Sequence, residues 1–380
     1  MDDRDGREAN DLVIVLTYYH PYVSGLTNVA KDLAEGLAAR GWRVCVVASK
    51  HDPSLPTHDE HHGVRIVRAP VLAKVGKGTV GLNLTRLALR EMARSRVVNL
   101  HLPLIEAGLL ARLSSRPVVS TYHCDVTLPP GLVNAAQQRA VDLSNRIALR
   151  RSAATVVSSE DYGRHSRLWP AIRPGMEAIP PPCTAREPGR PTFRDPEAPG
   201  GFHVGFLGRI VEEKGLEYLV DAFLALEDPD ARLLIGGDYT DVAGGSVVER
   251  VRRHIGDDPR VRLLGFIDEA DLDDFYASLD AFALPSVNAF EAFGIVQVVA
   301  MTSGVPAVVS ELPGVRTVVE RTGFGVAVAP RDSDGLTTAL ARLRDTPPDR
   351  EAGARSAREL YSVDAVLDAY EAVFAKAAGR

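Results

Sequence analysis

The chain of 380 residues is poor in cysteine and in lysine. Its three cysteines are Cys45, Cys124 and Cys183. They form no Cys-x-x-Cys pair and no disulfide framework, which excludes a disulfide-stapled scaffold and is typical of a reduced, cytoplasmic protein. Six of the 44 basic residues are lysine, and this bias towards arginine, with many alanines, indicates a GC-rich bacterial genome.

Long apolar runs and a strong net charge are also absent. No apolar run approaches the ~20 residues that span a bilayer, and the acidic residues 1–11 lack the basic start and apolar core of a signal peptide. A net charge of −6 argues against general nucleic-acid binding. The basic excess of residues 1–180 indicates an anionic acceptor or a membrane surface, or else solvated charge distributed by chance. We expect a cytoplasmic protein, with weak peripheral association at the inner face of the membrane as an open alternative.

Strand and helix patterns alternate along the first half of the chain. Residues 11–19 are a continuous apolar stretch of the kind buried in a parallel sheet, and residues 28–40 form an amphipathic helix that ends at Gly41. A strand at 43–48 completes a β-α-β unit, which implies parallel pairing. The alternation predicts further elements at 63–67 (strand), 82–93 (helix), 97–100 (strand), 105–113 (helix), 117–121 (strand) and 153–158 (strand).

A segment rich in proline and glycine at about 181–201 is typical of an interdomain linker, and a second alternation of strands and helices follows it. We predict an α/β fold of two Rossmann-like parallel-sheet domains that face a cleft. The N-terminal domain takes residues 1–180 with the C-terminal helix 361–380 packed back on it, and the second domain takes 202–360. Ligands of open α/β sheets bind beyond the carboxyl ends of the strands, so we expect the site in that cleft.

The most informative stretch surrounds Glu291. A strand at 281–284 leads into the loop that holds this carboxylate, and Gly294 opens a helix at 295–302, which a strand at 306–310 follows. Glycine lets the backbone approach a ligand closely, and the first N–H groups of a helix have no partner within it. This pattern predicts a site for a polyhydroxylated, anionic molecule.

Matching cations follow the first strand of the second domain. The strand at 202–207 ends before Gly208, which permits a tight exit, and Arg209 and Lys214 come next. A guanidinium and an ammonium beyond the carboxyl end of a strand suit a diphosphate leaving group. Such cations are usually solvated surface groups, so we assign them a binding role only because Glu291 lies in the same domain.

These motifs resemble a known family. G-x-L-G-R-x-x-x-x-K-G (205–215), E-A-F-G-I-V (291–296) and G-V-P-A-V-V-S (304–310) resemble the nucleotide-sugar domain of family 4 glycosyltransferases, which are retaining enzymes of the GT-B fold. Y-Y-H-P-Y-V-S-G-L-T (18–27) and S-T-Y-H-C-D (120–125) resemble the acceptor domain of the same family. The resemblance covers nearly the whole chain, and it is far more specific for the family than for the donor or the acceptor.

The resemblance implies roles for individual residues. Arg209 and Lys214 would hold the donor diphosphate, and Glu291 would contact hydroxyls of the transferred sugar. The other implied donor contacts are Gly25, Gly208, Phe266, Ile267, Phe293, Gly294, Ile295, Val296 and the position of Val299.

His123 follows the strand at 117–121, and the resemblance places it beside the anomeric carbon of the donor sugar. The alternative is a strand-end histidine that backbone groups satisfy, but its place in the expected cleft favours the functional interpretation. Asp125 would orient the acceptor or His123. His101 ends another strand, and either lines the acceptor site or has a structural role.

The chain departs from the family at Val299, where the family has a second glutamate that binds the ribose hydroxyls. Gln297 is offset by about 200° on the helix, so it should not substitute. Loss of this acceptor would cost about 1.5–3 kcal/mol of donor binding. Three explanations stay open: a deoxyribose donor such as a dTDP-sugar, another residue in its place, or a weakened or inactive relative. The presence of the other site residues favours a working enzyme.

Three further features have simpler explanations. The run H-D-E-H-H at 58–62 offers metal ligands, but its polar context and undiagnostic spacing favour a solvated loop. D-P-D at 228–230 imitates a metal motif, yet it precedes a strand and should face away from the site. The helix at 84–94 carries an arginine at every fourth position, which suits either anionic lipid or an exposed helix face.

We therefore predict a retaining hexosyltransferase that moves a sugar from a nucleotide-sugar donor to a hydroxyl acceptor: a cell-envelope glycan, a lipid-linked saccharide or a small metabolite. Its predicted catalytic residues are His123, Glu291, Arg209 and Lys214. Two cations are present and no credible carboxylate pair for Mg²⁺, so we expect no metal and no cofactor besides the co-substrate. A non-catalytic nucleotide-sugar-binding subunit and a GT-B sugar-nucleotide epimerase stay open. A phosphorylase would need a cofactor lysine, for which the chain offers no candidate.

Overall fold

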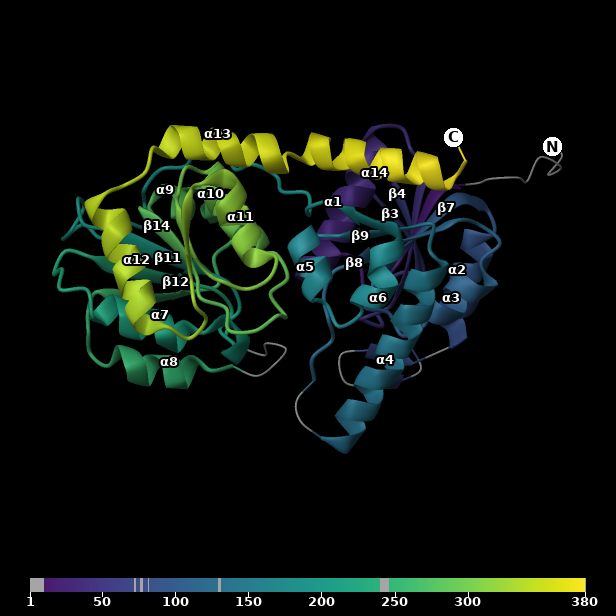
Figure 1. Cartoon of the computed structure of the whole chain (residues 1–380), viewed down its shortest axis with the longest axis horizontal. Coiled ribbons are helices and arrows are strands. Elements are labelled where there is room, and N and C mark those ends of the chain that lie inside the picture. The colour runs from purple at the N-terminus through teal and green to yellow at the C-terminus, as the bar shows by residue number, and fades with distance from the viewer. Residues whose placement is uncertain are drawn as a thin grey trace. The chain divides into compact units, whose positions relative to one another are not determined.

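The computed structural model of the chain describes residues 10–71, 73–75, 78–80, 82–128, 131–239 and 246–379. These residues form two compact units, each built around a parallel sheet with helices packed against it (Figure 1). Unit 1 comprises the chain up to Pro182 and again from Val363, and unit 2 comprises Cys183–Ser362. The predicted fold class, two parallel-sheet α/β domains, is confirmed.

The sheet of unit 1 has eight strands in the order β10-β9-β8-β7-β1-β2-β4-β3. All neighbours pair in parallel except the edge strand β3, which is antiparallel to β4. The central strands are rich in aliphatic residues and almost wholly buried, as expected for a covered parallel sheet, although β7 and β8 also carry buried polar side chains. The strands are β1 (Asn10–Val15), β2 (Val44–Ser49), β3 (His58–His61), β4 (Val64–Ala69), β7 (Ser95–Leu102), β8 (Val118–Tyr122), β9 (Ala154–Val157) and β10 (Met176–Ala178), and a separate hairpin pairs β5 (Ala73–Val75) with β6 (Gly78–Val80).

The C-terminal helix α14 (Val363–Ala377) belongs to unit 1, where it shares a hydrophobic core with α1 (Gly25–Ala39) and the sheet. The two helices approach closely: a methyl group on Gly36 would lie 2.7 Å from a side-chain carbon of Leu367. Arg40 continues the contact with ion pairs to three acidic residues of α14, Asp364, Asp368 and Glu371. Close packing and charge pairing together hold the end of the chain on α1. The remaining helices of unit 1 are α2 (Leu82–Met92), α3 (Ala107–Leu113), α4 (Leu132–Arg151), α5 (Glu160–His165) and α6 (Trp169–Ile172).

Helix α4, 20 residues long, was not predicted from the sequence. Its apolar pattern is weak, because Leu132, Val133 and Leu143 are largely exposed while only Asn145, Ala148 and Leu149 are buried. A helix that buries one short stretch lacks the 3.6-residue periodicity that marks amphipathic helices.

The six strands of unit 2 pair in parallel throughout, in the order β13-β12-β11-β14-β15-β16. One hydrophobic core lies between the sheet and α7, α8 and α12, and a second core lies between the sheet and α9, α10, α11 and α13. The strands are β11 (His203–Leu207), β12 (Arg232–Gly236), β13 (Val261–Gly265), β14 (Ala281–Leu284), β15 (Ala307–Ser310) and β16 (Gly325–Val328). The helices are α7 (Leu216–Leu224), α8 (Val248–Ile255), α9 (Leu272–Ala277), α10 (Ile295–Thr302), α11 (Val315–Thr322), α12 (Ser333–Asp345) and α13 (Arg350–Tyr361).

Residues 183–201, within the predicted linker, form neither helix nor strand, but they are tied to unit 2. The Phe193 backbone N–H donates to Ser278 Oγ at 3.0 Å, and Arg194 pairs with Asp280 at 2.6 Å. Among the described residues, no helix is long and apolar enough to cross a membrane.

Candidate functional site

Strand order locates the ligand-binding edge of unit 2. β11 comes first in the chain, β12 and β13 extend the sheet on one side of it, and β14 to β16 extend it on the other. The order therefore reverses between β11 and β14, and ligands of such sheets bind at the carboxyl ends of the strands beside that reversal. The loop after β11 carries Arg209 and Lys214, and the loop after β14 carries Glu291.

These two loops are held against each other within unit 2. The Val287 backbone N–H donates to the Glu213 carbonyl at 3.0 Å. Gly215 has φ +63°, and a methyl group there would lie 2.3 Å from the Pro285 carbonyl oxygen. Only glycine combines this left-handed conformation with so close an approach, so Gly215 allows the lysine loop to reach the carboxyl end of β14.

Lys214 and Glu291 form an ion pair, with Nζ 2.5 Å from Oε2 and both side chains mostly buried. Ser286, directly after β14, donates from Oγ to the same oxygen at 3.2 Å. Burial alone would raise the pKa of Glu291, but the Lys214 ammonium and hydrogen bonds from Ser286 and the Gly294 backbone N–H outweigh it and lower that pKa. Glu291 is therefore an ionised acceptor beside a cation, and we call Arg209, Lys214, Ser286 and Glu291 the charged cluster.

The start of α10 lies next to this cluster. Gly294 precedes the helix with φ +77°, and a methyl group there would lie 2.4 Å from a side-chain carbon of Leu284. The glycine thus brings the open N–H groups at the start of α10 to the end of β14. Gln297 is buried, and its Nε2 donates to the carbonyls of Phe293 and Val315 at 2.6 and 3.0 Å. It points into the core, in line with its predicted offset from Val299.

The other predicted donor contacts of unit 2 have varied surroundings. Arg209 forms an ion pair with Glu213 of the same loop at 3.2 Å. Phe266, directly after β13, is 72% exposed, whereas Ile267 is buried in the core. Phe293 is also buried in the core, and Ile295, Val296 and Val299 are half-buried on α10. Their contacts with a donor, and that of Gly208, stay predictions.

Unit 1 has a corresponding reversal of strand order between β1 and β7. Gly25 begins α1 directly after the loop that follows β1, and a methyl group there would meet nothing within 4 Å. His101 lies near the end of β7, and His123 follows β8. The carboxyl edge of this sheet therefore carries the predicted residues Gly25, His101 and His123.

A chain of hydrogen bonds runs from Asn99 through His101 to His123. Asn99 Nδ2 donates to the Val119 carbonyl and to Thr121 Oγ1 at 3.1 and 3.0 Å, so its Oδ1 faces His101 Nε2 at 2.8 Å. Oδ1 only accepts, so His101 carries its proton on Nε2 and accepts at Nδ1. His123 Nε2, 2.9 Å away, then donates, and the proton-free Nδ1 of His123 is an acceptor. We call these three residues the imidazole chain.

Both imidazoles are neutral near pH 7. Burial, and secondarily the neighbouring His123, holds the pKa of His101 well below its ordinary value. Burial lowers the pKa of His123 to about 4. The imidazole chain therefore offers hydrogen bonds without charge, which suits sugar hydroxyls.

Asp125 has structural partners. Its buried carboxylate accepts hydrogen bonds from Tyr122 Oη at 2.6 Å, from Ser166 Oγ at 2.9 Å and from the Arg167 backbone N–H at 3.3 Å. These bonds fix the loop that follows His123. The predicted contact of Asp125 with an acceptor stays a prediction.

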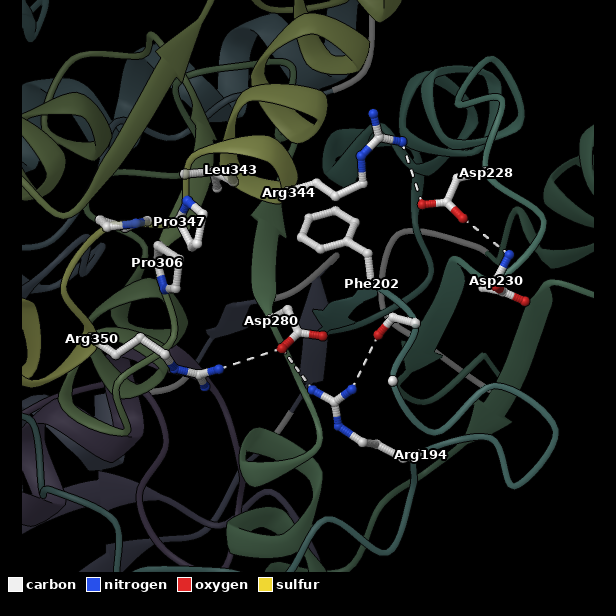
Figure 2. A pocket seen from close by; sticks show the side chains of 13 residues that line it. Arg194, Phe202, Asp228, Asp230, Asp280, Pro306, Leu343, Arg344, Pro347 and Arg350 are labelled. Atoms are coloured by element: carbon white, nitrogen blue, oxygen red, sulfur yellow. Dashed lines mark hydrogen bonds and ion pairs between the residues drawn. The ribbon is translucent and has the colours of Figure 1, made fainter.

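A pocket of about 380 Å³ in unit 2 lies at the opposite edge of the sheet (Figure 2). Phe202, Asp280 and Pro306 line it, and each directly precedes a strand: β11, β14 and β15. Asp228 and Asp230 of the D-P-D motif also line it, before β12, which agrees with the expected orientation of that motif away from the carboxyl edge. Arg194 and Arg350 pair with Asp280, and Arg344 pairs with Asp228. Because the pocket lies at the opposite edge of the sheet, it is separate from the charged cluster.

Comparison with known proteins identifies the family. The family model described as "Glycosyl transferases group 1" matches residues 201–346, and the one described as "Glycosyl transferase 4-like domain" matches residues 24–182. The chain belongs to the family 4 glycosyltransferases. This glycosyltransferase is 28% identical to a glycogen synthase of Mycobacterium tuberculosis, over 93% of the chain and 90% of that protein. It is 29% identical to the 2-deoxystreptamine glucosyltransferase of Streptomyces kanamyceticus, over 86% of the chain and 91% of that protein.

The fold of the glycosyltransferase is likewise that of known relatives. A sucrose-phosphate synthase structure from Thermosynechococcus elongatus superposes with a TM-score of 0.75 at 21% identity, and covers 96% of this chain and 99% of that one. The predictions of a family 4 glycosyltransferase and of sugar transfer from a nucleotide-sugar donor are confirmed.

Sequence reasoning assigned no role to three residues that shape these clusters. Ser286 could have been suspected from its place directly after a buried strand, where functional side chains gather. Asn99 stands two residues before His101 on a strand, so both side chains face the same way. The close approach of Gly215 to the end of β14 has no signal in the sequence beyond the glycine itself.

Proposed function

We propose that the chain is a retaining, metal-independent hexosyltransferase. The acceptor hydroxyl oxygen forms a bond to the anomeric carbon while the bond between that carbon and the diphosphate oxygen breaks, and the hydroxyl proton passes to the departing nucleoside diphosphate. Arg209, Lys214 and the amides at the start of α10 stabilise the charge that develops on the diphosphate. Glu291 accepts hydrogen bonds from hydroxyls of the transferred sugar, and His123 Nδ1 accepts one more.

The observation that carries the proposal is the Lys214–Glu291 ion pair at the strand-order reversal of unit 2. A cation and an ionised carboxylate 2.5 Å apart match the two parts of a nucleotide sugar, its anionic diphosphate and its hydroxyl-rich ring. Lys214 also helps to keep Glu291 ionised, and the ion pair orients both side chains before the donor arrives, which supports a preorganised site.

The test is a thermal-shift screen with UDP-, GDP-, ADP- and dTDP-sugars, followed by turnover with the stabilising donor and a panel of glucan, aminocyclitol and lipid-linked acceptors. We expect stabilisation by one nucleotide, and a product whose anomeric configuration by NMR equals that of the donor. An inverted product contradicts retention. Donor binding without turnover favours a non-catalytic subunit, and free nucleotide released without any acceptor favours an epimerase.

Metal independence has its own test. In the proposed mechanism Arg209, Lys214 and the amides at the start of α10 stabilise the departing diphosphate, which is the role that a divalent ion would otherwise have. We expect activity to persist in EDTA. Activity that EDTA abolishes and Mg²⁺ restores would contradict this part of the proposal.

We further propose a cytoplasmic protein that associates weakly with anionic membrane surfaces through α3 and α4. Leu109 and Leu113 on α3, and Leu132 and Leu143 on α4, are 46–92% exposed, and α4 ends with two arginines. Apolar side chains beside arginines suit the boundary of an anionic bilayer. Sedimentation with anionic but not neutral vesicles, weakened in a Leu132→Ser/Leu143→Ser variant, would support a lipid-linked acceptor. Equal sedimentation of both proteins would contradict the membrane contact.

A further inference from the structure

A cluster of metal-ligating side chains lies in unit 1, apart from the imidazole chain. It consists of Glu35 on α1 with His61 and His62, where β3 turns into β4. One ligand atom from each residue lies within 4.8 Å of the other two. The sequence predicted a solvated loop here, which is wrong for His58–His61, because these residues form the edge strand β3. Glu35 is distant in the sequence, and only the fold brings it to the two histidines.

One oxygen of the Glu35 carboxylate lacks a hydrogen-bond donor. Its Oε1 is buried, and no donor among the described residues makes a hydrogen bond to it. Oε1 lies 3.6 Å from His61 Nε2, which is too long for a hydrogen bond. Two ligand atoms that are each about 2.1 Å from a tetrahedral zinc ion lie roughly 3.4 Å apart. The spacing therefore fits two ligands of one cation better than a direct contact.

We propose that Glu35, His61 and His62 bind a Zn²⁺ ion, with water completing the tetrahedron. Two imidazoles and one carboxylate are a donor set that zinc accepts, whereas Mg²⁺ and Ca²⁺ prefer oxygen ligands alone. His62 is exposed, so its ring can turn towards the other two ligands without disturbing the core. Lys31 pairs with the second carboxylate oxygen of Glu35 at 3.6 Å and leaves Oε1 to the metal.

The site would couple strands β3 and β4 to the loop that follows β1. His20 lies in that loop, and its ring stacks on His61 with centroids 4.2 Å apart and planes 7° apart. Arg68 of β4 donates to the His20 carbonyl at 2.9 Å and pairs with Asp59 of β3 at 2.8 Å. Zinc bound at His61 would therefore order the same loop that leads to Gly25. This effect is separate from the proposed transfer chemistry, in which no metal takes part.

The experiment is calorimetric titration of the untagged, chelator-treated chain with ZnCl₂ and, separately, with MgCl₂. We expect one equivalent of zinc to bind and Mg²⁺ not to bind, with slower hydrogen exchange in residues 17–25 and 58–63 of the zinc-loaded protein. His61→Ala and His62→Asn should each weaken zinc binding at least tenfold. His62 has φ +47°, a conformation that asparagine adopts readily, so His62→Asn should fold normally.

The control is His58→Ala, which removes an exposed histidine from the same strand β3 but not from the cluster. It should leave zinc binding unchanged. Absence of saturable zinc binding would overturn the proposal. So would a His62→Asn variant that binds zinc as tightly as the unchanged chain, or a His58→Ala variant that loses binding to the same extent.

Discussion

The charged cluster of unit 2 and the imidazole chain of unit 1 occupy equivalent places, each at the carboxyl edge of a parallel sheet beside its strand-order reversal. Their chemistry is opposite. The charged cluster pairs a lysine with an ionised glutamate, whereas the imidazole chain is a run of neutral groups whose proton positions are set by hydrogen bonds. The same kind of sheet edge thus carries a charged cluster in one unit and a neutral one in the other, and the difference comes from the side chains near the carboxyl ends of the strands.

The largest effect is expected from removing Lys214, the cation that pairs with Glu291 in the charged cluster. In Lys214→Met the departing diphosphate loses one stabilising group, and we expect kcat to fall by about 10²–10³. The measurement is steady-state turnover, beside Lys376→Met, which removes an 81% exposed lysine of α14 and should change nothing.

Lys214→Met also leaves the Glu291 carboxylate buried without its partner, which destabilises unit 2. The double variant Lys214→Met/Glu291→Gln removes that unpaired charge. We expect it to regain thermal stability while activity stays lost. Activity that returns together with stability would mean that Lys214 is structural.

A change of pH tests the neutral character of the imidazole chain. The pKa of His123 is about 4 in the folded protein and near 6.5 when unfolded. As pH falls from 6.5 to 4 His123 therefore takes up a proton in the unfolded chain but not in the folded one, and this residue alone lowers the stability by at most about 3 kcal/mol, to which His101 adds in the same direction. The measurement is urea unfolding at pH 7, 6 and 5. A His101→Asn/His123→Asn variant should show a smaller loss, and an identical loss in both proteins would contradict the assignment.

The sequence anticipated the charged cluster more completely than the imidazole chain, for a physical reason. The strand, glycine and helix around Glu291 are contiguous, so β14 and α10 match the expected 281–284 and 295–302 residue for residue. The imidazole chain, in contrast, depends on which side chains meet across neighbouring strands. The pairing of His101 on β7 with Thr121 on β8 places Asn99, His101 and His123 together, and no single motif encodes it.

Two other features lay beyond sequence reasoning for related causes. Helix α4 exposes much of its apolar surface, so the periodicity that marks a buried face is missing. The carboxylate of Asp125 is engaged by Ser166 and Arg167, about 40 residues further along the chain, and such partners become visible only once the fold is formed.

A smaller effect is expected at Val299 of unit 2, where the family has a second glutamate. If the donor carries ribose, Val299→Glu supplies an acceptor for its hydroxyls, and donor KM should fall about tenfold or more, equivalent to at least about 1.5 kcal/mol. Val299 is half-buried on α10, so Val299→Gln serves as a control of similar size without charge. A Val299→Glu protein that folds well but uses no ribonucleotide donor better would show that this position does not explain donor choice.

The smallest expected effect concerns the proton positions in the imidazole chain. In Asn99→Asp a carboxylate faces His101 Nε2 and favours the doubly protonated ring, so His101 Nδ1 becomes a donor. His123 must then accept at Nε2 and carry its proton on Nδ1, which removes the acceptor offered to the sugar. We expect kcat to fall about tenfold, the equivalent of one hydrogen bond, with little change in donor KM.

The readout that separates this effect from simple destabilisation is ¹⁵N NMR of the His123 ring, which should report the proton on Nε2 in the unchanged chain and on Nδ1 in Asn99→Asp. The matched control is Asn145→Asp, which places a carboxylate at another buried asparagine of unit 1, where Oδ1 accepts from the Leu104 backbone N–H at 3.2 Å. That variant should lose stability without moving the His123 proton. If His123 keeps its Nε2 proton in Asn99→Asp, or if Asn145→Asp lowers kcat equally, then Asn99 does not position His123, and the imidazole chain supports only the fold of unit 1.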